Sequence, residues 1–142
     1  MKELKSRDRD LIFMGRIIED YYGNEALDKL IEYKAEKTRK TWLKKASESG
    51  RKDPGYLLQL FNEKVHDYEV IRNDDKCLEV KVYHCKHAEI FKSFNAEDLG
   101  KKLICEGDRA VVAGFNSNIE LKRPEIAMTG DYCHFIFKLK NE

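Results

Sequence analysis

The sequence has no long apolar run, no excess of one charge and no segment that resembles a secretion signal. Its apolar stretches, such as residues 11–14 and 135–137, are far too short to cross a membrane. No basic N-terminal stretch precedes a long apolar core, as a secretion signal requires. Lys and Arg number 27 against 26 acidic residues, so the net charge of +1 gives no general attraction to nucleic acid. We therefore expect a cytoplasmic protein with neither a membrane nor a nucleic-acid partner.

Several common site motifs are also missing. The cysteines at positions 77, 85, 105 and 133 form no C-x-x-C pair, which excludes zinc-ribbon and thioredoxin-like sites. The sequence contains no glycine-rich phosphate loop, no G-x-S-x-G and no H-E-x-x-H. In a reducing compartment the cysteines are expected to stay free thiols.

The length of 142 residues is typical of one domain. Hydrophobic residues make up 42% of the chain, enough for a packed core without disulfide support. We expect a single domain over residues 1–142, with a helical part over 1–65 and a mixed part over 66–142 that carries the candidate site.

The first part has apolar residues at helical spacing. The pattern predicts a helix over residues 7–22 and a longer one that Asn24 caps and Gly50 ends. Asp53, followed by Pro54, is typical of the start of a third helix, with apolar positions continuing to residue 65.

The second part changes to the alternation of strands. Residues 66–72 and 78–82 predict a hairpin, and short helices are expected between residues 88 and 115. A third strand begins at Ile119, where Pro124 indicates an edge strand or a bulge, and a fourth begins at Cys133. The predicted fold is α+β, with N-terminal helices packed on a small antiparallel sheet of two hairpins separated by helices.

Three short segments in the second part combine a cysteine with polar residues at the end of a predicted element. They are residues 84–89, 105–108 and 131–134. Thiolate, imidazole and carboxylate groups together can bind zinc or a similar divalent metal. They can also supply a cysteine nucleophile with a histidine base, or a carboxylate base such as Asp108 or Glu89 acting on water.

Packing is the alternative for each cysteine, because free cysteine is among the most buried residue types. Cys77 begins a predicted strand and is expected to be structural. Cys133 is in phase with Phe135, whereas His134 points to the opposite face of a regular strand. His66 is expected at the surface. The tyrosines at positions 21 and 22 and the tryptophan at 42 are expected in the core or in a subunit contact.

Four segments, in order, resemble the L-2-amino-thiazoline-4-carboxylic acid hydrolase family over roughly residues 65–140. Residues 84–91 resemble Cys-x-x-Ala-Glu-x-Phe, 103–108 Cys-x-x-Asp, 114–121 Gly-Phe-Asn-Pro-x-Ile-x-Leu, and 130–135 a pattern ending in Cys-x-Phe. The chain departs from these patterns at Ser117, Pro124 and His134. The resemblance points to Cys85, Glu89, Cys105, Asp108, Asn116 and Cys133 as site residues.

The family reaction opens a cyclic amidine: water adds to the ring carbon between sulfur and nitrogen and gives N-carbamoyl-cysteine. It needs an activated water or thiolate, a general acid for the leaving nitrogen, and a partner for the substrate carboxylate. The resemblance implies Asp108 or Glu89 as base. It implies Cys85, Cys105 and Cys133 as metal ligands, for example of zinc, or one of them as nucleophile. Asn116 is implied in substrate binding, and Arg109 or Arg123 in binding the carboxylate.

Two other readings remain open. The same pocket is also expected in a non-catalytic module that binds a small molecule or a metal, similar to the four-vinyl reductase type. A structural domain that forms a homodimer through its aromatic N-terminal helix is the other alternative.

Overall fold

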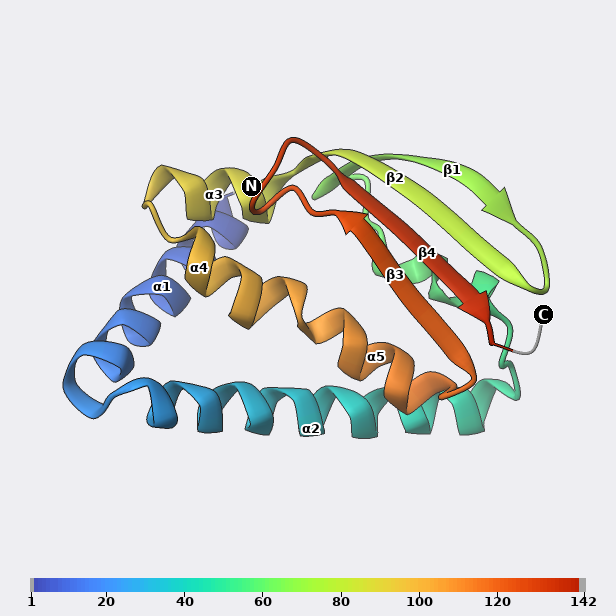
Figure 1. The fold of residues 1–142 in the computed structure, drawn as a ribbon, viewed down its shortest axis with the longest axis horizontal. Coiled ribbons are helices and arrows are strands. Elements are labelled where there is room, and N and C mark those ends of the chain that lie inside the picture. Colours follow the sequence, from blue (N-terminus) through green and yellow to red (C-terminus); the bar gives the residue numbers. More distant parts are fainter. Residues whose placement is uncertain (1, 141–142) are drawn as a thin grey trace.

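Two long helices form one side of the molecule. The computed structural model describes residues 2–140, and it begins with α1 (Lys2–Tyr22) and α2 (Asn24–Ser49). Gly23, at φ 86°, separates the two helices, which diverge in a V (Figure 1). Gly50 ends α2 in the left-handed conformation that glycine adopts most easily. Both predicted helices are confirmed, although Gly23 occupies the cap position expected for Asn24.

The rest of the chain forms a sheet and a series of shorter helices. The elements, in order, are η1 (a 3₁₀ helix, Pro54–Leu60), β1 (His66–Asn73), β2 (Cys77–Cys85), α3 (Lys86–Ser93), α4 (Glu97–Gly100), η2 (a π-helical segment, Lys101–Cys105), α5 (Gly107–Phe115), β3 (Ile119–Glu125) and β4 (Cys133–Leu139). The predicted third helix is therefore only a short 3₁₀ helix, because the backbone is already extended at Phe61 on its way to β1.

The sheet is antiparallel with the order β1-β2-β4-β3, and its two hairpins join where β2 pairs with β4. Pro124 lies in the edge strand β3, where the pairing with β4 shifts register between Lys122 and Glu125. A proline is tolerated at such a position because no ladder hydrogen bond is lost. The predicted α+β fold is confirmed.

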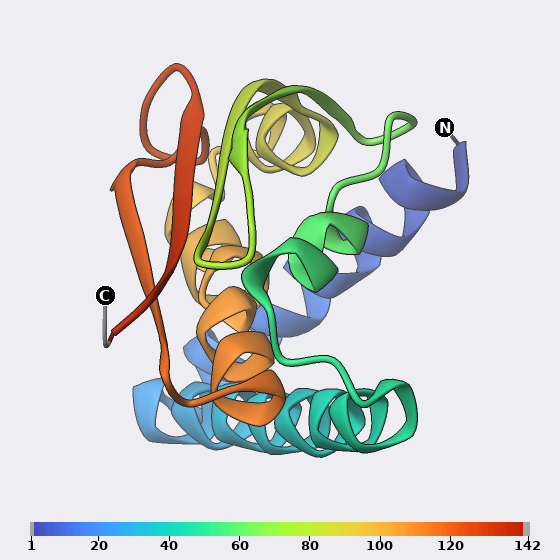
Figure 2. The ribbon, with the colours of Figure 1, turned by 90° about the vertical axis from the view of Figure 1, so that its right-hand side faces the viewer.

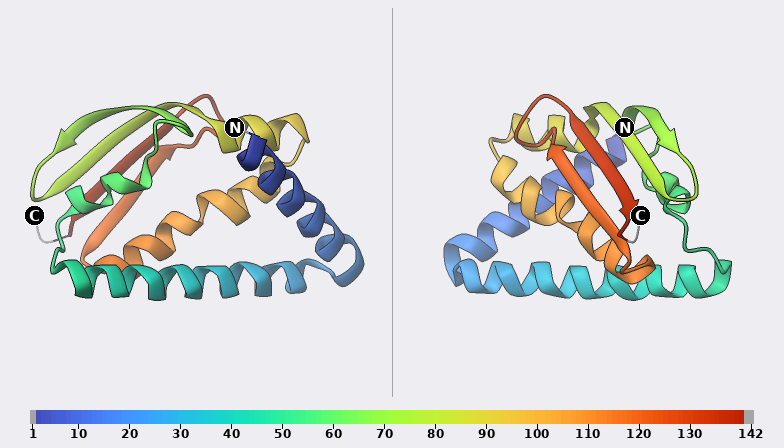
Figure 3. Two further views of the ribbon diagram at one scale, coloured as in Figure 1. Left: turned by 180° about the vertical axis from the view of Figure 1, so that it is seen from behind. Right: turned by 45° about the vertical axis from the view of Figure 1, so that its right-hand side comes forward.

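The helix α5 lies between α2 and the sheet (Figures 1 and 2). Buried side chains from the helices and the sheet form one continuous hydrophobic cluster. Trp42 of α2 meets Phe115 of α5 edge to face, and Phe61 packs in the same way on Phe135 of β4. Seen from behind, the segment α4–η2–α5 crosses the space between the V of helices and the sheet (Figure 3). This segment therefore presents residues to both sides.

The aromatic residues of the helical part have different environments. Trp42 is buried, whereas the side chains of Tyr21 and Tyr22 are 76% and 74% exposed. The core expectation thus holds for Trp42 and not for the two tyrosines. Within residues 2–140, none of the helices combines the length and the apolar character needed to cross a membrane.

Candidate functional site

A cavity of about 170 Å³ lies between the sheet and the segment from α3 to α5. Its lining combines apolar side chains with thiols, imidazoles and one carboxylate. These residues are Leu60, Phe61, His66, Val82, Cys85, His87, Ile104, Cys105, Asp108, Cys133 and Phe135. Four of the predicted site residues, namely Cys85, Cys105, Asp108 and Cys133, therefore line one space although they come from separate segments.

Each thiol is placed by the end of an element. Cys85 is the last residue of β2 and precedes the first turn of α3. Cys105 ends the π-helical segment η2, a local geometry that is frequent at functional sites. Cys133 begins β4, where its Sγ accepts a hydrogen bond of 3.0 Å from the backbone N–H of Ala127. Strand and helix ends thus converge on the cavity.

The three thiols are held in their neutral form. Burial raises the pKa of Cys105 to about 12, with smaller contributions from Cys133 and Asp108. Burial also raises the pKa of Cys133 to about 11, against the hydrogen bond from Ala127. The pKa of Cys85 is raised by burial too, and the backbone N–H groups of α3 oppose the shift. None of the three is therefore an activated thiolate in the resting protein.

Slow alkylation is the expected consequence at Cys105. At pH 8 its reaction with iodoacetamide should be on the order of 10–100-fold slower than that of free cysteine, because the thiolate is scarce even though its intrinsic nucleophilicity is higher. Mass spectrometry of peptides after timed labelling measures this rate, and labelling in urea is the control. Labelling at the rate of free cysteine would contradict a desolvated thiol.

Asp108 combines partial burial with a charged neighbour. Burial raises its pKa to about 6, although the guanidinium of Arg123 opposes the shift. The distance from Arg123 Nη1 to Asp108 Oδ2 is 3.3 Å. A carboxyl group with a pKa near 6 can both donate and accept a proton near neutral pH, as acid–base catalysis requires.

Arg123 holds the junction between η2 and α5. Its side chain is only 4% exposed, and it donates to the backbone oxygen of Cys105 as well as to Asp108 and Glu106. Its Nε is buried without a hydrogen-bond partner among the described residues. Arg123 thus attaches the edge strand β3 to the two segments that supply Cys105 and Asp108.

Two histidines and a buried aspartate also belong to the site. His87, two residues after Cys85, lines the cavity, and its Nδ1 lies 2.6 Å from Oδ2 of Asp8 on α1. His66 lines the cavity instead of lying at the surface as expected, and burial lowers its pKa to about 4. Helical spacing could have indicated Asp8 from the sequence, because it lies four residues from both Leu4 and Ile12 and shares their buried face of α1.

The other predicted site residues lie elsewhere. Glu89 is exposed, with Lys86 as its neighbour at 3.9 Å. The side-chain nitrogen of Asn116 donates to the backbone oxygen of Lys52 at 2.9 Å. Arg109 is exposed and pairs with Glu106. Arg109 and Arg123 thus already have carboxylate partners, and the cavity lining among residues 2–140 includes neither Lys nor Arg that could bind a substrate carboxylate there.

Cys77 and His134 both lie in the sheet, outside the cavity lining. Cys77 is buried, as expected for a structural residue. His134 lies on the opposite face from Cys133, where its Nε2 is 2.7 Å from Oε2 of Glu79. No group of three or more His, Cys, Asp or Glu side chains among residues 2–140 is arranged to hold a metal ion. The thiols that line the cavity thus do not fit a metal centre, and we derive no step through one.

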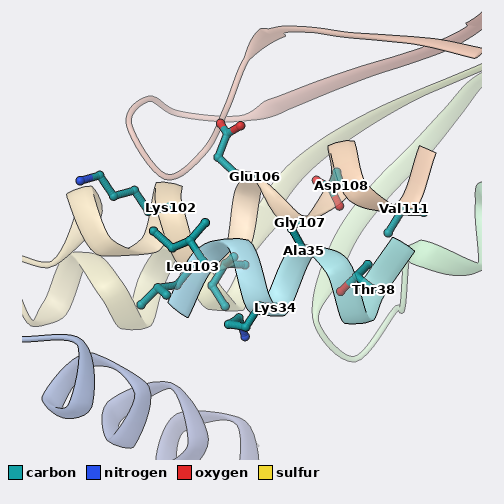
Figure 4. Close-up of a pocket in the computed structure, with 11 residues that line it drawn as sticks. Lys34, Ala35, Thr38, Lys102, Leu103, Glu106, Gly107, Asp108 and Val111 are labelled. Carbon is teal, nitrogen blue, oxygen red and sulfur yellow. The ribbon is translucent and has the colours of Figure 1, made fainter. Parts of the chain in front are cut away.

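A second cavity of about 280 Å³ lies on the other side of Asp108, between α2 and the η2–α5 segment. Figure 4 shows its lining on α2, including Ala35 and Thr38, beside Gly107 and Val111 of α5. Asp108 and Ile104 line both cavities. They therefore form the wall between the two spaces.

The comparisons with known proteins agree with this arrangement at the level of family. Neither the curated proteins nor the solved structures gave a match. The sequence profile of the L-2-amino-thiazoline-4-carboxylic acid hydrolases, in contrast, matches residues 11–137, which include α2, the sheet up to residue 137 of β4 and every residue that lines the cavity of the thiols. The chain belongs to the L-2-amino-thiazoline-4-carboxylic acid hydrolase family.

Proposed function

We propose that this protein hydrolyses a small cyclic amidine of the thiazoline carboxylate type in the cavity of the thiols. The observation that carries the proposal is the convergence of Cys85, Cys105, Asp108 and Cys133, which come from three separate segments that resemble the family patterns, on one space. Two imidazoles in the same space add acid–base groups. An apolar wall that includes Phe61 and Phe135 suits the carbon and sulfur atoms of such a ring.

The chemistry of the product decides which bond breaks. An N-carbamoyl product keeps both nitrogens on the ring carbon, so the bond from that carbon to sulfur is cleaved. The leaving atom is therefore sulfur and not the nitrogen that the resemblance first implied. Water is the nucleophile in this proposal, because the three cysteines are neutral thiols.

Asp108 is assigned the role of proton donor to the leaving sulfur. A pKa of about 6 leaves a useful fraction of the carboxyl group protonated near neutral pH. This role replaces that of base, which the resemblance suggested for Asp108 or Glu89. Glu89 is exposed and does not line the cavity.

The test is the release of a free thiol. The purified protein should convert L-2-amino-thiazoline-4-carboxylate to a product that reacts with a thiol reagent and has the mass of N-carbamoyl-cysteine. The reagent distinguishes the two possible ring openings, because cleavage of the carbon–nitrogen bond gives an S-carbamoyl product without a free thiol. The D isomer and protein-free buffer are the controls. Thiol release no faster than in buffer would overturn the proposed reaction.

A binding module is the second candidate, and the apolar wall of the cavity favours it. In that case the thiazoline should raise the thermal unfolding midpoint progressively, with the logarithm of its concentration above Kd, while no thiol appears. The same samples thus separate an enzyme from a binder.

A further inference from the structure

We propose that His87 is the base that takes a proton from the attacking water, and that Asp8 of α1 is the residue that positions it. This inference rests on the proposed hydrolysis and adds two residues that the sequence patterns did not indicate. It makes α1, which lies outside all four patterns, part of the catalytic site.

Asp8 is a buried carboxylate with a single described hydrogen-bond partner. It is 3% exposed and lies in the row of buried residues on α1 formed with Leu4 and Ile12. Burying a carboxylate costs free energy unless the group is paired, so an aspartate at this position would be more stable facing solvent if it had no partner. The partner is His87, at 2.6 Å. The buried face of α1 thus carries a carboxylate at a position that contacts this imidazole.

The position of α1 is itself held by a salt bridge further along the helix. Arg16 donates from both terminal nitrogens to the two carboxylate oxygens of Asp98 on α4, each at 2.9 Å. Bidentate pairs of this kind fix geometry as well as charge. Asp8 therefore approaches His87 from a helix that is attached to the segment leading to Cys105 and Asp108.

The contact with Asp8 orients the imidazole. A carboxylate oxygen accepts hydrogen bonds, so the proton in this contact belongs to Nδ1 of His87. The other ring nitrogen, Nε2, then carries a lone pair, and His87 lines the cavity. An imidazole held by a carboxylate on one nitrogen and open on the other is the general arrangement of a histidine base.

The other groups that face the cavity are poorer bases. His66 of β1 is neutral, since burial and the proximity of His87 lower its pKa to about 4, and its Nδ1 accepts the backbone N–H of Asn62 at 3.2 Å. Cys85, Cys105 and Cys133 are neutral thiols. Asp108 of α5 is assigned a different role, the donation of a proton to the leaving sulfur. His87 is the group with an orienting partner and an open lone pair.

The proton balance closes with these two groups. Water forms the new bond to the ring carbon and loses a proton to Nε2 of His87, and the electron pair of the carbon–nitrogen double bond moves to the ring nitrogen. His87 passes its proton to that nitrogen. The carbon–sulfur bond then breaks, its electron pair leaves with sulfur, and Asp108 donates the proton. The hydroxyl becomes the carbonyl and returns a proton to Asp108.

The test is a pair of substitutions that keep the hydrogen bond. In His87→Asn the amide N–H can still reach Asp8, but no atom replaces Nε2. We expect kcat to fall on the order of 10²–10⁴-fold, with KM changed less than about threefold. In Asp8→Asn the amide can still contact Nδ1, but it fixes the proton there less strongly than a carboxylate does, so a smaller fall than in His87→Asn is expected. Added imidazole should restore part of the turnover of His87→Ala, which a merely structural role would not allow.

The controls are residues of the same types nearby. His84→Asn and Asp10→Asn change exposed side chains outside the cavity and should keep kcat. Circular dichroism checks that each variant folds. Nitrogen NMR of the wild-type imidazoles should show His87 protonated on Nδ1, and Asp8→Asn should weaken that preference.

The outcomes separate the two proposals. If the wild type releases thiol and His87→Asn stays within about threefold of it, the role of His87 is overturned while the proposed function stands. If the wild type releases no thiol, the proposed function is overturned and the base assignment with it. The NMR spectrum then still decides whether Asp8 orients His87, because that measurement needs no turnover.

Discussion

Replacing Asp108 with asparagine should lower kcat for thiazoline opening on the order of 10²–10⁴-fold, because the amide cannot donate the proton that the leaving sulfur requires. Asparagine has nearly the same shape, and its carbonyl oxygen can still accept a hydrogen bond from Arg123, which lies 3.3 Å from Asp108. The measurement is thiol release under saturating substrate. Asp131→Asn, an exposed change at the turn before β4, is the matched control.

The dependence of kcat on pH provides a second check on the role of Asp108. The protonated form of Asp108 is the active one, so kcat should decline as pH rises through about 6, where the wild-type group loses its proton. Burial is the main cause of this raised pKa, and the neighbouring titratable groups that modify it are Arg123 of β3, Glu106 and Arg109 beside it, and the imidazole of His87 of α3. The residual activity of Asp108→Asn should lack the decline. A variant that keeps full activity, or the same decline in both proteins, would contradict the assignment.

The same group should affect stability in a known direction. The raised pKa means that folded Asp108 holds its proton more tightly than the unfolded chain does. Its contribution to stability is therefore present at low pH and is lost as pH rises from about 4 through about 6. The free energy of unfolding of Asp108→Asn minus that of the wild type should therefore be larger at pH 7 than at pH 4. Urea unfolding of both proteins at the two pH values measures this difference. An unchanged difference would indicate a carboxyl group with an ordinary pKa.

Replacing Gly114 with valine should destabilise the fold by about 3 kcal/mol or more. A β-carbon at this position would lie 2.1 Å from the backbone oxygen of Arg39, a distance at which the two helices must separate. The neighbouring atom belongs to the backbone of α2, so no side-chain rotation relieves the clash. Urea unfolding followed by circular dichroism measures the loss, and even Gly114→Ala should show much of it.

Gly107 in the first turn of the same helix is the matched control. Nothing lies within 4 Å of the position that its β-carbon would take. Gly107→Ala should therefore leave stability unchanged or raise it by up to about 1 kcal/mol, as expected from helix propensity. Similar losses for the two variants would contradict the close contact of α5 with α2. The contact matters for the site because α5 carries Asp108 at its start.

The sequence predicted most elements because each depends on local chemistry. Apolar spacing located α1 and α2, alternation located the strands, and Pro124 indicated the edge strand. The third helix was overestimated, because its apolar residues suit a helix and an extended segment equally well. The chain had to turn at Phe61 to bring β1 beside β2, and a local pattern does not contain that requirement.

The sequence by itself determined the α+β fold and the family, and its motifs contained four residues that line one cavity, since these follow from composition, periodicity and short motifs. Only the tertiary structure decided which of the predicted residues meet. It separated Glu89, Asn116, Arg109 and Arg123 from the cavity lining, and it joined Asp8 to His87 across 79 positions. The physical reason is that spacing fixes the face on which a side chain lies, whereas the partner of that face depends on how distant elements pack. An aspartate is the same letter in the sequence whether it is buried or exposed. Only the structure shows that Asp8 is buried against the imidazole of His87, at 2.6 Å.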